Sequence, residues 1–330
     1  TVIGIFQALA ATLFVDAALL VVHLIMPDKL TLPQLLTLGA IATATAPAAT
    51  LMVVREYKAK GPLTSLLLPI VALDDAVGLI VFAVCFGISK TLVSGEVDLI
   101  SIIVNPLIEI VLSLILGAIM GWLLTHLEKL FNSRTNRLNL TIAFVFLTVA
   151  LTMFDFHVGP VHIGFSSLLV CMMLGTIFCN LCPLSHDLMN ASDKWTSPLF
   201  ALFFVISGAE LELNVFLDGA IILIGIVYIL FRCVGKYFGA AFSAKATKCS
   251  PQICKYLGIT LFPQAGVALG MALKAETLGT EGAIVANITL FSVLIYELVG
   301  PFLTKVSLTK AGEIKPEGKT SARKSVDWKH

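Results

Sequence analysis

The sequence predicts an all-α, polytopic membrane protein. Of its 330 residues, 58% are hydrophobic and 13% are charged, whereas soluble domains average about 25% charged residues. The mean hydropathy is +0.96. This composition excludes an ordinary soluble enzyme and a disordered chain. The net charge of +1 at pH 7 offers no basic surface, so we expect no nucleic-acid partner.

The spans are predicted from apolar runs of roughly 18 residues or more, the length that lets a helix cross a ~30 Å hydrocarbon core. Ten such runs follow one another along the chain: 2–26, 32–54, 63–89, 101–126, 138–154, 161–180, 197–215, 219–244, 254–274 and 282–304. We therefore expect about ten spans within the lipid bilayer.

The orientation is predicted from the loops, because cytoplasmic loops collect Lys and Arg. Ten spans place both ends of the chain on one side of the membrane. Segments on that side contain 17 of the 22 basic residues, and the opposite loops contain three, Lys29, Lys90 and Lys274. We expect a multi-pass protein of the cell membrane, a bacterial cytoplasmic membrane, with both ends cytoplasmic and a flexible cytoplasmic tail over 305–330.

Ionisable side chains inside spans are costly and are candidates for function. Asp74 and Asp75 lie in the middle of a predicted span. Adjacent helical residues point about 100° apart, so one carboxylate can face a cation while the other meets a fixed charge. A buried carboxylate poised between its protonated and ionised forms can trade a proton for a cation. The alternative is a structural pair that locks helix packing.

Two basic side chains also lie inside a predicted span. Arg232 and Lys236 are spaced i, i+4 and share one helix face. They need anionic partners at membrane depth, and Asp16 is a candidate partner for Arg232, in a structural role. The alternative is snorkelling of the basic groups to the interface. Glu109 and Glu297 have no assigned partner.

Two predicted spans have the pattern of broken helices. Pro47 interrupts the run 32–54 just after Thr43 and Thr45, and Pro263, followed by Gly266, interrupts the run 254–274. Proline removes a backbone hydrogen bond, and unpaired backbone is tolerated at membrane depth only inside protein or beside water. Matched interrupted spans are typical of a transporter's binding site. The alternative is a pair of simple kinks.

The interrupted spans also indicate an inverted repeat. Pro47 and Pro263 are 216 positions apart, and the same offset relates Asp16 to Arg232. Seven spans separate the equivalent elements, so the two units cross the membrane in opposite senses. We expect a first repeat of the transport domain at 1–89, central core and scaffold spans at 90–218, and a second repeat at 219–304. Lys236 and the aspartates would compensate the half-helix ends that meet near the midplane.

These residues carry a family resemblance. Four motifs follow one another: Asp74-Asp75, Arg232 to Lys236 (RCVGK), Leu261 to Ala268 (LFPQAGVA), and Gly300-Pro301 followed by Ala311 to Ile314 (AGEI). Together they resemble the monovalent cation:proton antiporters, in particular the electrogenic double-aspartate branch of NhaA-like and NapA-like sodium/proton antiporters. The resemblance implies the NhaA-like fold with two crossed broken helices.

The resemblance also implies roles for individual residues. Asp75 is the main carrier of Na⁺ and protons, Asp74 pairs with Lys236, and Thr43 and Thr45 line the crossover. Where the family often has Thr-Asp-Pro, this chain has Thr45-Ala46-Pro47. The family usually has two or three spans upstream of these, which help to form a homodimer in the full-length protein.

The expected function is exchange of Na⁺, or of Li⁺ or K⁺, for H⁺ by alternating access, with a role in pH homeostasis. We expect no enzymatic activity and no cofactor beyond the transported ions. One alternative is a sodium-coupled organic-solute symporter of similar fold, whose wider site would be richer in Asn, Gln and Ser. The others are an ion channel, which usually shows filter loops or pore-lining rings, and a sensor with an inactive transport fold.

Overall fold

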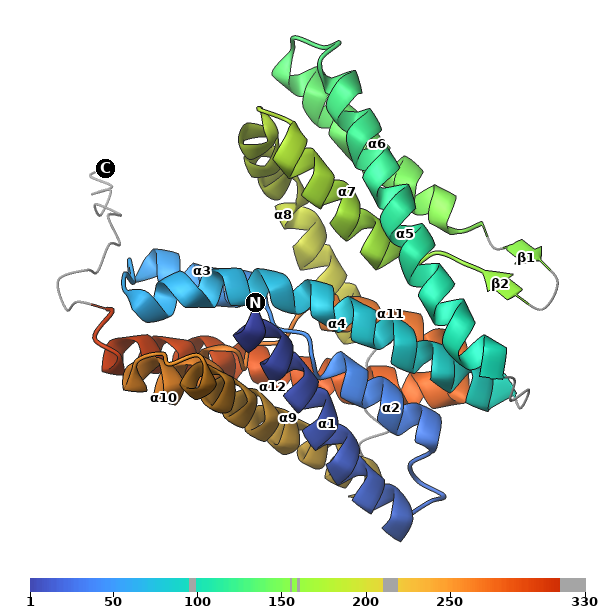
Figure 1. The fold of residues 1–330 in the computed structure, drawn as a ribbon, viewed down its shortest axis with the longest axis vertical. Helices are drawn as coiled ribbons and strands as arrows, with labels where there is room; N and C mark the ends of the chain where they lie inside the picture. Colours follow the sequence, from blue (N-terminus) through green and yellow to red (C-terminus); the bar gives the residue numbers. More distant parts are fainter. Residues whose placement is uncertain (95–98, 155, 159–160, 210–218, 315–330) are drawn as a thin grey trace, which may run out of the picture. The chain divides into compact units, whose positions relative to one another are not determined.

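The computed structural model describes residues 1–94, 99–154, 156–158, 161–209 and 219–314 (Figure 1). Within these ranges the chain is almost entirely helical. The α-helices are α1 (Val2–Ile25), α2 (Leu32–Ile41), α3 (Pro47–Glu56), α4 (Pro62–Ser94), α5 (Leu99–Glu128), α6 (Arg134–Thr152), α7 (Ser167–Leu181), α8 (Ser185–Ala209), α9 (Gly219–Ala246), α10 (Pro251–Thr260), α11 (Gly266–Ala275) and α12 (Thr280–Lys310), with a 3₁₀ turn η2 (Glu276–Leu278) before α12.

One feature departs from the all-α prediction. Strands β1 (Phe156–Val158) and β2 (Val161–Ile163) form an antiparallel pair, with Phe156 opposite Ile163 and Val158 opposite Val161. The pair falls where the apolar run 161–180 was expected to begin as a helix, and α7 starts only at Ser167. Val, Ile and Phe favour strands as readily as buried helices, so an apolar count alone does not separate the two.

Each predicted apolar run contains at least one helix among the described residues. Of the described helices, six are long and apolar enough to cross a membrane, compared with the ten spans predicted: α1, α4, the Leu107–Glu128 part of α5, α6, α9 and α12. The runs 32–54 and 254–274 each contain two shorter helices, α2–α3 and α10–α11. The run 197–215 is described only as far as Ala209, within α8.

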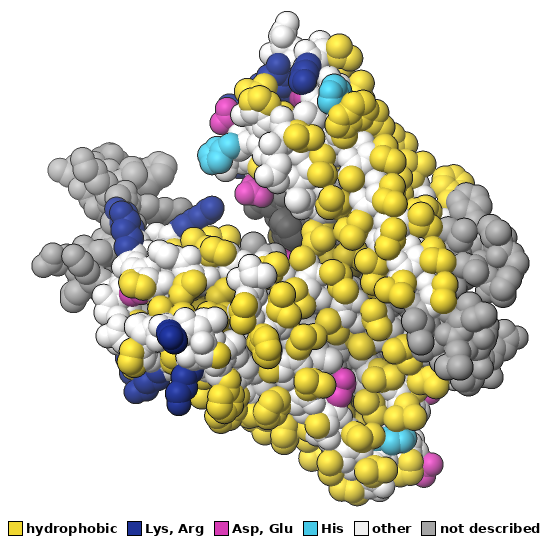
Figure 2. Space-filling model, in the orientation of Figure 1, with side chains coloured by type: hydrophobic (Ala, Val, Ile, Leu, Met, Phe, Trp, Pro, Cys, Tyr) yellow, Lys and Arg dark blue, Asp and Glu magenta, His cyan; other side chains and the backbone are white. Residues whose placement is uncertain are grey.

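The outer surface is strongly apolar. Figure 2 shows hydrophobic side chains over much of the visible face, with Lys and Arg side chains gathered in a few places. On α1 alone, Phe6 is 61% exposed, Leu13 66% and Leu24 74%. Water would penalise so much exposed apolar area. This is the surface expected of a multi-pass membrane protein.

The chain forms two compact units, one of residues 1–78 and 212–330 and the other of residues 79–211. In the first unit, α1 packs along α9. The contact is close because Gly235 and Gly239 face it. A Cβ on Gly235 would lie 2.7 Å from the Cα of Ala11, and one on Gly239 would lie 2.6 Å from the Cβ of Ala10. Small residues allow this approach between membrane helices, where dispersion contacts drive association.

In the second unit, α5 packs against α7 in the same way. A Cβ on Gly121 would lie 2.6 Å from the carbonyl oxygen of Leu174. Next to this contact, Met120, Leu124, Phe144 and Phe178 form a buried apolar cluster. Close packing and apolar burial therefore hold α5, α6 and α7 together.

The C-terminal end of the first unit is more ordered than predicted. The flexible tail was expected from residue 305, but α12 continues to Lys310, and residues 315–330 lie outside the described residues. The buried Glu313 carboxylate accepts hydrogen bonds from the backbone N–H groups of Leu63 (2.6 Å) and Thr64 (2.7 Å) and from the Thr64 hydroxyl (2.6 Å). Glu313 thus supplies acceptors for the first turn of α4, whose N–H groups have no partner within the helix.

Candidate functional site

Two helix interruptions lie side by side in the first unit. The chain leaves helical geometry between Ile41 and Pro47 and again between Thr260 and Gly266. Pro47 occupies the first turn of α3, where its missing N–H costs nothing. The Ala46 N–H donates to the Pro263 carbonyl at 2.8 Å, which joins the two interruptions directly.

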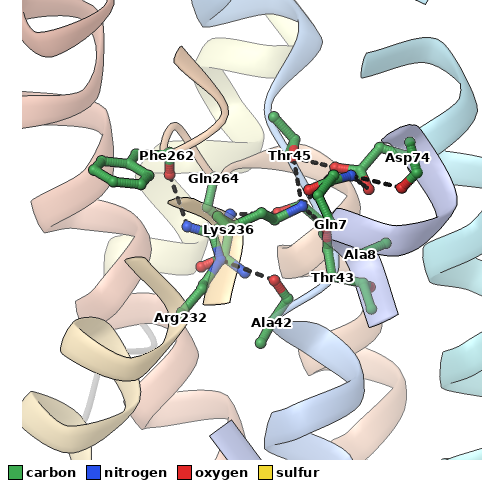
Figure 3. Close-up of polar contacts among 12 residues, drawn as sticks. Gln7, Ala8, Ala42, Thr43, Thr45, Asp74, Arg232, Lys236, Phe262 and Gln264 are labelled. Carbon is green, nitrogen blue, oxygen red and sulfur yellow. Dashed lines mark hydrogen bonds and ion pairs between the residues drawn. The ribbon is translucent and has the colours of Figure 1, made fainter. Parts of the chain in front are cut away.

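The interruptions leave backbone carbonyls that need donors at depth. Side chains of α9 and of the second interruption supply them (Figure 3). Arg232 donates to the carbonyls of Ala42 (3.0 Å), Ala44 (2.5 Å) and Phe262 (2.7 Å), and the Gln264 amide donates to that of Ile41 (2.9 Å). A fixed cation is stabilising at the C-terminal end of a helix, and α2 and α10 both end here.

Arg232 therefore contacts backbone carbonyls and not Asp16, the partner expected from the sequence. Its guanidinium is fully buried and lies 4.4 Å from the centre of the Tyr296 ring. Asp16 instead lies against Gly39 of α2, and its Oδ1 has no hydrogen-bond partner among the described residues. Carbonyl oxygens, with no formal charge, compensate the guanidinium in place of a carboxylate.

Asp74 and Lys236, which the sequence analysis paired, form a buried ion pair. The Lys236 Nζ lies 2.7 Å from Asp74 Oδ2, and both side chains are 0% exposed. Lys236 also donates to the Thr45 hydroxyl at 2.9 Å and to the Thr43 carbonyl. The Thr45 hydroxyl in turn donates to Asp74 Oδ2. One lysine thus joins α4, α9 and the first interruption.

Asp75 has a different environment from Asp74. It is only partly buried, and its Oδ1 has no partner among the described residues. The Lys236 ammonium contacts Asp74 and not Asp75. The two adjacent carboxylates of α4 therefore differ. Asp74 is fixed by the Lys236 ammonium, whereas Asp75 has an oxygen without a partner among the described residues.

The remaining predicted residues lie around this cluster. The Thr43 hydroxyl donates to the Ala40 carbonyl at 2.7 Å, so in this conformation only its backbone oxygen contacts Lys236. Gly266 begins α11, and a Cβ there would meet no atom within 4 Å. Its role in the site is therefore not one of close backbone contact.

A comparison with protein families identifies the family of the chain. The chain matches the model of the family described as sodium/hydrogen exchanger, transmembrane, over residues 2–310. The chain belongs to this family. A search of curated proteins found no match. The exchangers are transporters that carry cations and protons in opposite directions, so this protein is a cation:proton antiporter in the general sense.

The buried polar cluster contains residues that the sequence analysis did not assign to a site. Gln7 of α1 and Gln264 are fully buried and take part in the hydrogen bonds around Asp74 and Arg232. Gln264 also contacts the Tyr228 hydroxyl of α9, with Nε2 at 3.1 Å. The available signal was that each amide lies in an otherwise apolar run, where a polar side chain must find a buried partner.

Proposed function

We propose that the protein exchanges cytoplasmic Na⁺ for external H⁺ by alternating access, as a member of the electrogenic double-aspartate branch of its family. Li⁺ and K⁺ are the other candidate cargoes. The observation that carries this proposal is the buried Asp74–Lys236 pair beside the partly free Asp75, at the point where two interrupted helices meet. A site of one ionisable carboxylate and one fixed pair suits ion exchange better than binding of an organic solute.

Ionised Asp75 would bind the cation, and proton uptake by the same carboxylate would release it. A hard monovalent cation prefers several oxygen ligands, by the same logic that governs Ca²⁺ and Mg²⁺ sites. Thr43 and Thr45 would supply further oxygens once their present hydrogen bonds open. The Asp74–Lys236 pair would break on cation binding and re-form on release. Support comes from Lys236, which contacts both Thr45 and Asp74 and so connects the ligands to the pair.

The proposed architecture has ten spans and two inverted repeats, 2–89 and 219–304. Each proposed repeat has an interrupted middle span, and both repeats lie largely in the first compact unit. In this proposal the repeats move against spans of the 101–215 region, both chain ends are cytoplasmic, and the full-length protein is a homodimer in a bacterial cytoplasmic membrane. The physiological role would be sodium extrusion or pH homeostasis.

The test is an exchange assay in everted membrane vesicles that contain the protein. A proton gradient is formed first, and then Na⁺, Li⁺ or K⁺ is added in parallel samples. We expect Na⁺ to dissipate the gradient, and the order of the three ions gives the selectivity. Failure of all three ions to do so would overturn the proposal, and Na⁺-dependent uptake of a labelled organic solute would favour a symporter instead.

A further inference from the structure

The nitrogen of the buried Gln7 amide has hydrogen-bond partners, whereas its oxygen has none among the described residues. Its Nε2 donates to Asp74 Oδ1 at 2.5 Å (Figure 3). The same nitrogen donates to the Gly4 carbonyl at 2.9 Å. Its Oε1 is buried and has no partner among the described residues. The opposite amide orientation would place this oxygen against the carboxylate of Asp74, so the chemistry of an ionised Asp74 fixes the orientation.

The oxygens around Asp74 fall into two groups. The Asp74 carboxylate accepts from Gln7, Thr45 and Lys236, and the Thr45 hydroxyl is occupied at the same time. The Thr43 hydroxyl donates within its own segment. Two buried oxygens next to Asp74, Gln7 Oε1 and Asp75 Oδ1, have no hydrogen-bond partner within the part of the chain that the structure describes. Gln7 donates a hydrogen bond to Asp74, and Asp75 follows Asp74 in the chain.

A buried acceptor without a partner costs about 1–3 kcal/mol, and a state of the protein that satisfies it recovers that free energy. A cation accepts electron pairs from such oxygens, whereas a second hydrogen-bond acceptor would be repelled. An amide oxygen is a regular ligand for hard cations. The unpartnered oxygen of Gln7 therefore suits a cation, or a water molecule in its first hydration shell.

We propose that Gln7 is a specificity-determining residue of the exchange site. Its N–H groups hold Asp74 in place opposite Lys236, and its Oε1 supplies a neutral oxygen ligand to the transported cation. This inference rests on the proposed function and adds α1 to the elements that form the site. Because the ligand has no charge, its position favours one cation radius over another without changing the charge balance of the exchange.

The test uses Gln7→Met, which keeps an unbranched side chain of similar length and removes both the donor and the oxygen. The matched control is Gln34→Met, since Gln34 is also buried in the first unit but bonds the Thr31 N–H at 2.9 Å, away from the aspartates. Both variants and the wild-type chain are assayed in vesicles for KM and maximal rate with Na⁺, Li⁺ and K⁺. Loss of a hydrogen bond to a charged group predicts a rise of about tenfold in the KM for the preferred cation in Gln7→Met.

A ligand role also predicts a changed ratio of the three KM values, whereas a packing role lowers the amount of folded protein and leaves the ratio unchanged. Gln7→Asn, which keeps the amide but withdraws it from Asp74, should raise KM by a smaller factor. Stabilisation of the detergent-solubilised protein by Na⁺ gives a second readout, because an ion that binds only the folded state raises Tm by an amount that grows with its concentration relative to Kd. Wild-type KM values and Na⁺ stabilisation in Gln7→Met would overturn the inference. Absence of exchange in the wild-type chain would instead overturn the proposed function.

Discussion

At the scale of single residues, buried charges determine the chemistry of the site. Asp74 and Lys236 are 0% exposed and 2.7 Å apart. Burial of two charges carries a large desolvation penalty. Their attraction offsets this penalty only when hydrogen bonds satisfy the remaining lone pairs and protons. Here Gln7, Thr45 and the Thr43 carbonyl do so. Neutral hydrogen-bonding groups therefore hold the buried pair in place.

Substitution of Lys236 should show how far the stability of the protein depends on compensation of the Asp74 charge. In Lys236→Ala, Asp74 keeps its hydrogen bonds but loses its counter-ion, and an uncompensated buried charge costs about 3–5 kcal/mol. We expect a lower Tm in detergent and a changed charge stoichiometry of exchange. The control is Lys129→Ala, which removes an exposed lysine in the other unit.

Restoring neutrality separates the electrostatic effect from packing. In the double variant Lys236→Met with Asp74→Asn, no unpaired charge remains, and most of the lost thermal stability should return. Equal losses of Tm in Lys236→Ala and in the double variant would contradict the account.

At the scale of elements, the ends of helices α2 and α10 at the interruptions are stabilised by a side chain of another helix, α9. Arg232 bonds carbonyls of both interrupted spans. Its planar guanidinium can reach three acceptors in fixed directions, which an ammonium group cannot reproduce. The first interruption contains Thr45-Ala46-Pro47 without a carboxylate, and in the described structure Arg232 compensates the ends of α2 and α10 instead.

Arg232→Lys should therefore not be conservative. At least one carbonyl of the interruptions would lose its donor, at a cost of about 1–3 kcal/mol for each buried acceptor left unpaired. The expected result is a Tm below that of the wild-type protein, measured in detergent by scanning fluorimetry. A wild-type Tm would show that the three carbonyl contacts do not contribute to stability.

The start of α4 gives a second test at this scale. Glu313→Ala removes the acceptor for the Leu63 and Thr64 N–H groups, and loss of a helix N-terminal acceptor costs about 0.5–2 kcal/mol. Hydrogen exchange should accelerate at the amides of residues 63–66. Glu56→Ala, in which an exposed carboxylate is removed nearby, should leave this exchange unchanged, and equal protection in both variants would contradict a capping role.

The sequence located a helix in each apolar run but did not predict every helix boundary or all of the side-chain partners. Apolar runs located the helices, and Pro47 and Pro263 located both interruptions, because proline acts through local backbone chemistry. The partners of Arg232 could not be predicted, since backbone carbonyls carry no sequence signal. The role of Gln7 and the capping contact of Glu313 were missed for a related reason: nothing in the local sequence indicates their partners, which are Asp74 and backbone N–H groups of α4. The strand pair at 156–163 was missed because its residues suit both strand and helix.

At the scale of the whole molecule, charge sorting predicts how the chain crosses the membrane. Basic residues cluster in alternate loops, and such loops remain cytoplasmic. In a cysteine-free background, Lys129→Cys should react with a membrane-impermeant maleimide only from the cytoplasmic face, and Lys29→Cys only from the outer face. Labelling of both positions from the same face would contradict the ten-span arrangement.

The most direct measurement concerns Asp75, whose Oδ1 has no hydrogen-bond partner among the described residues. Asp75→Asn keeps the size of the side chain and removes its ability to exchange a proton for a cation. In everted vesicles with a preformed proton gradient, the wild-type protein and the exposed-loop control Asp28→Asn should dissipate the gradient when Na⁺ is added. Asp75→Asn, at equal expression, should not. Full Na⁺-dependent dissipation by Asp75→Asn would contradict the assignment of Asp75 as the carrier.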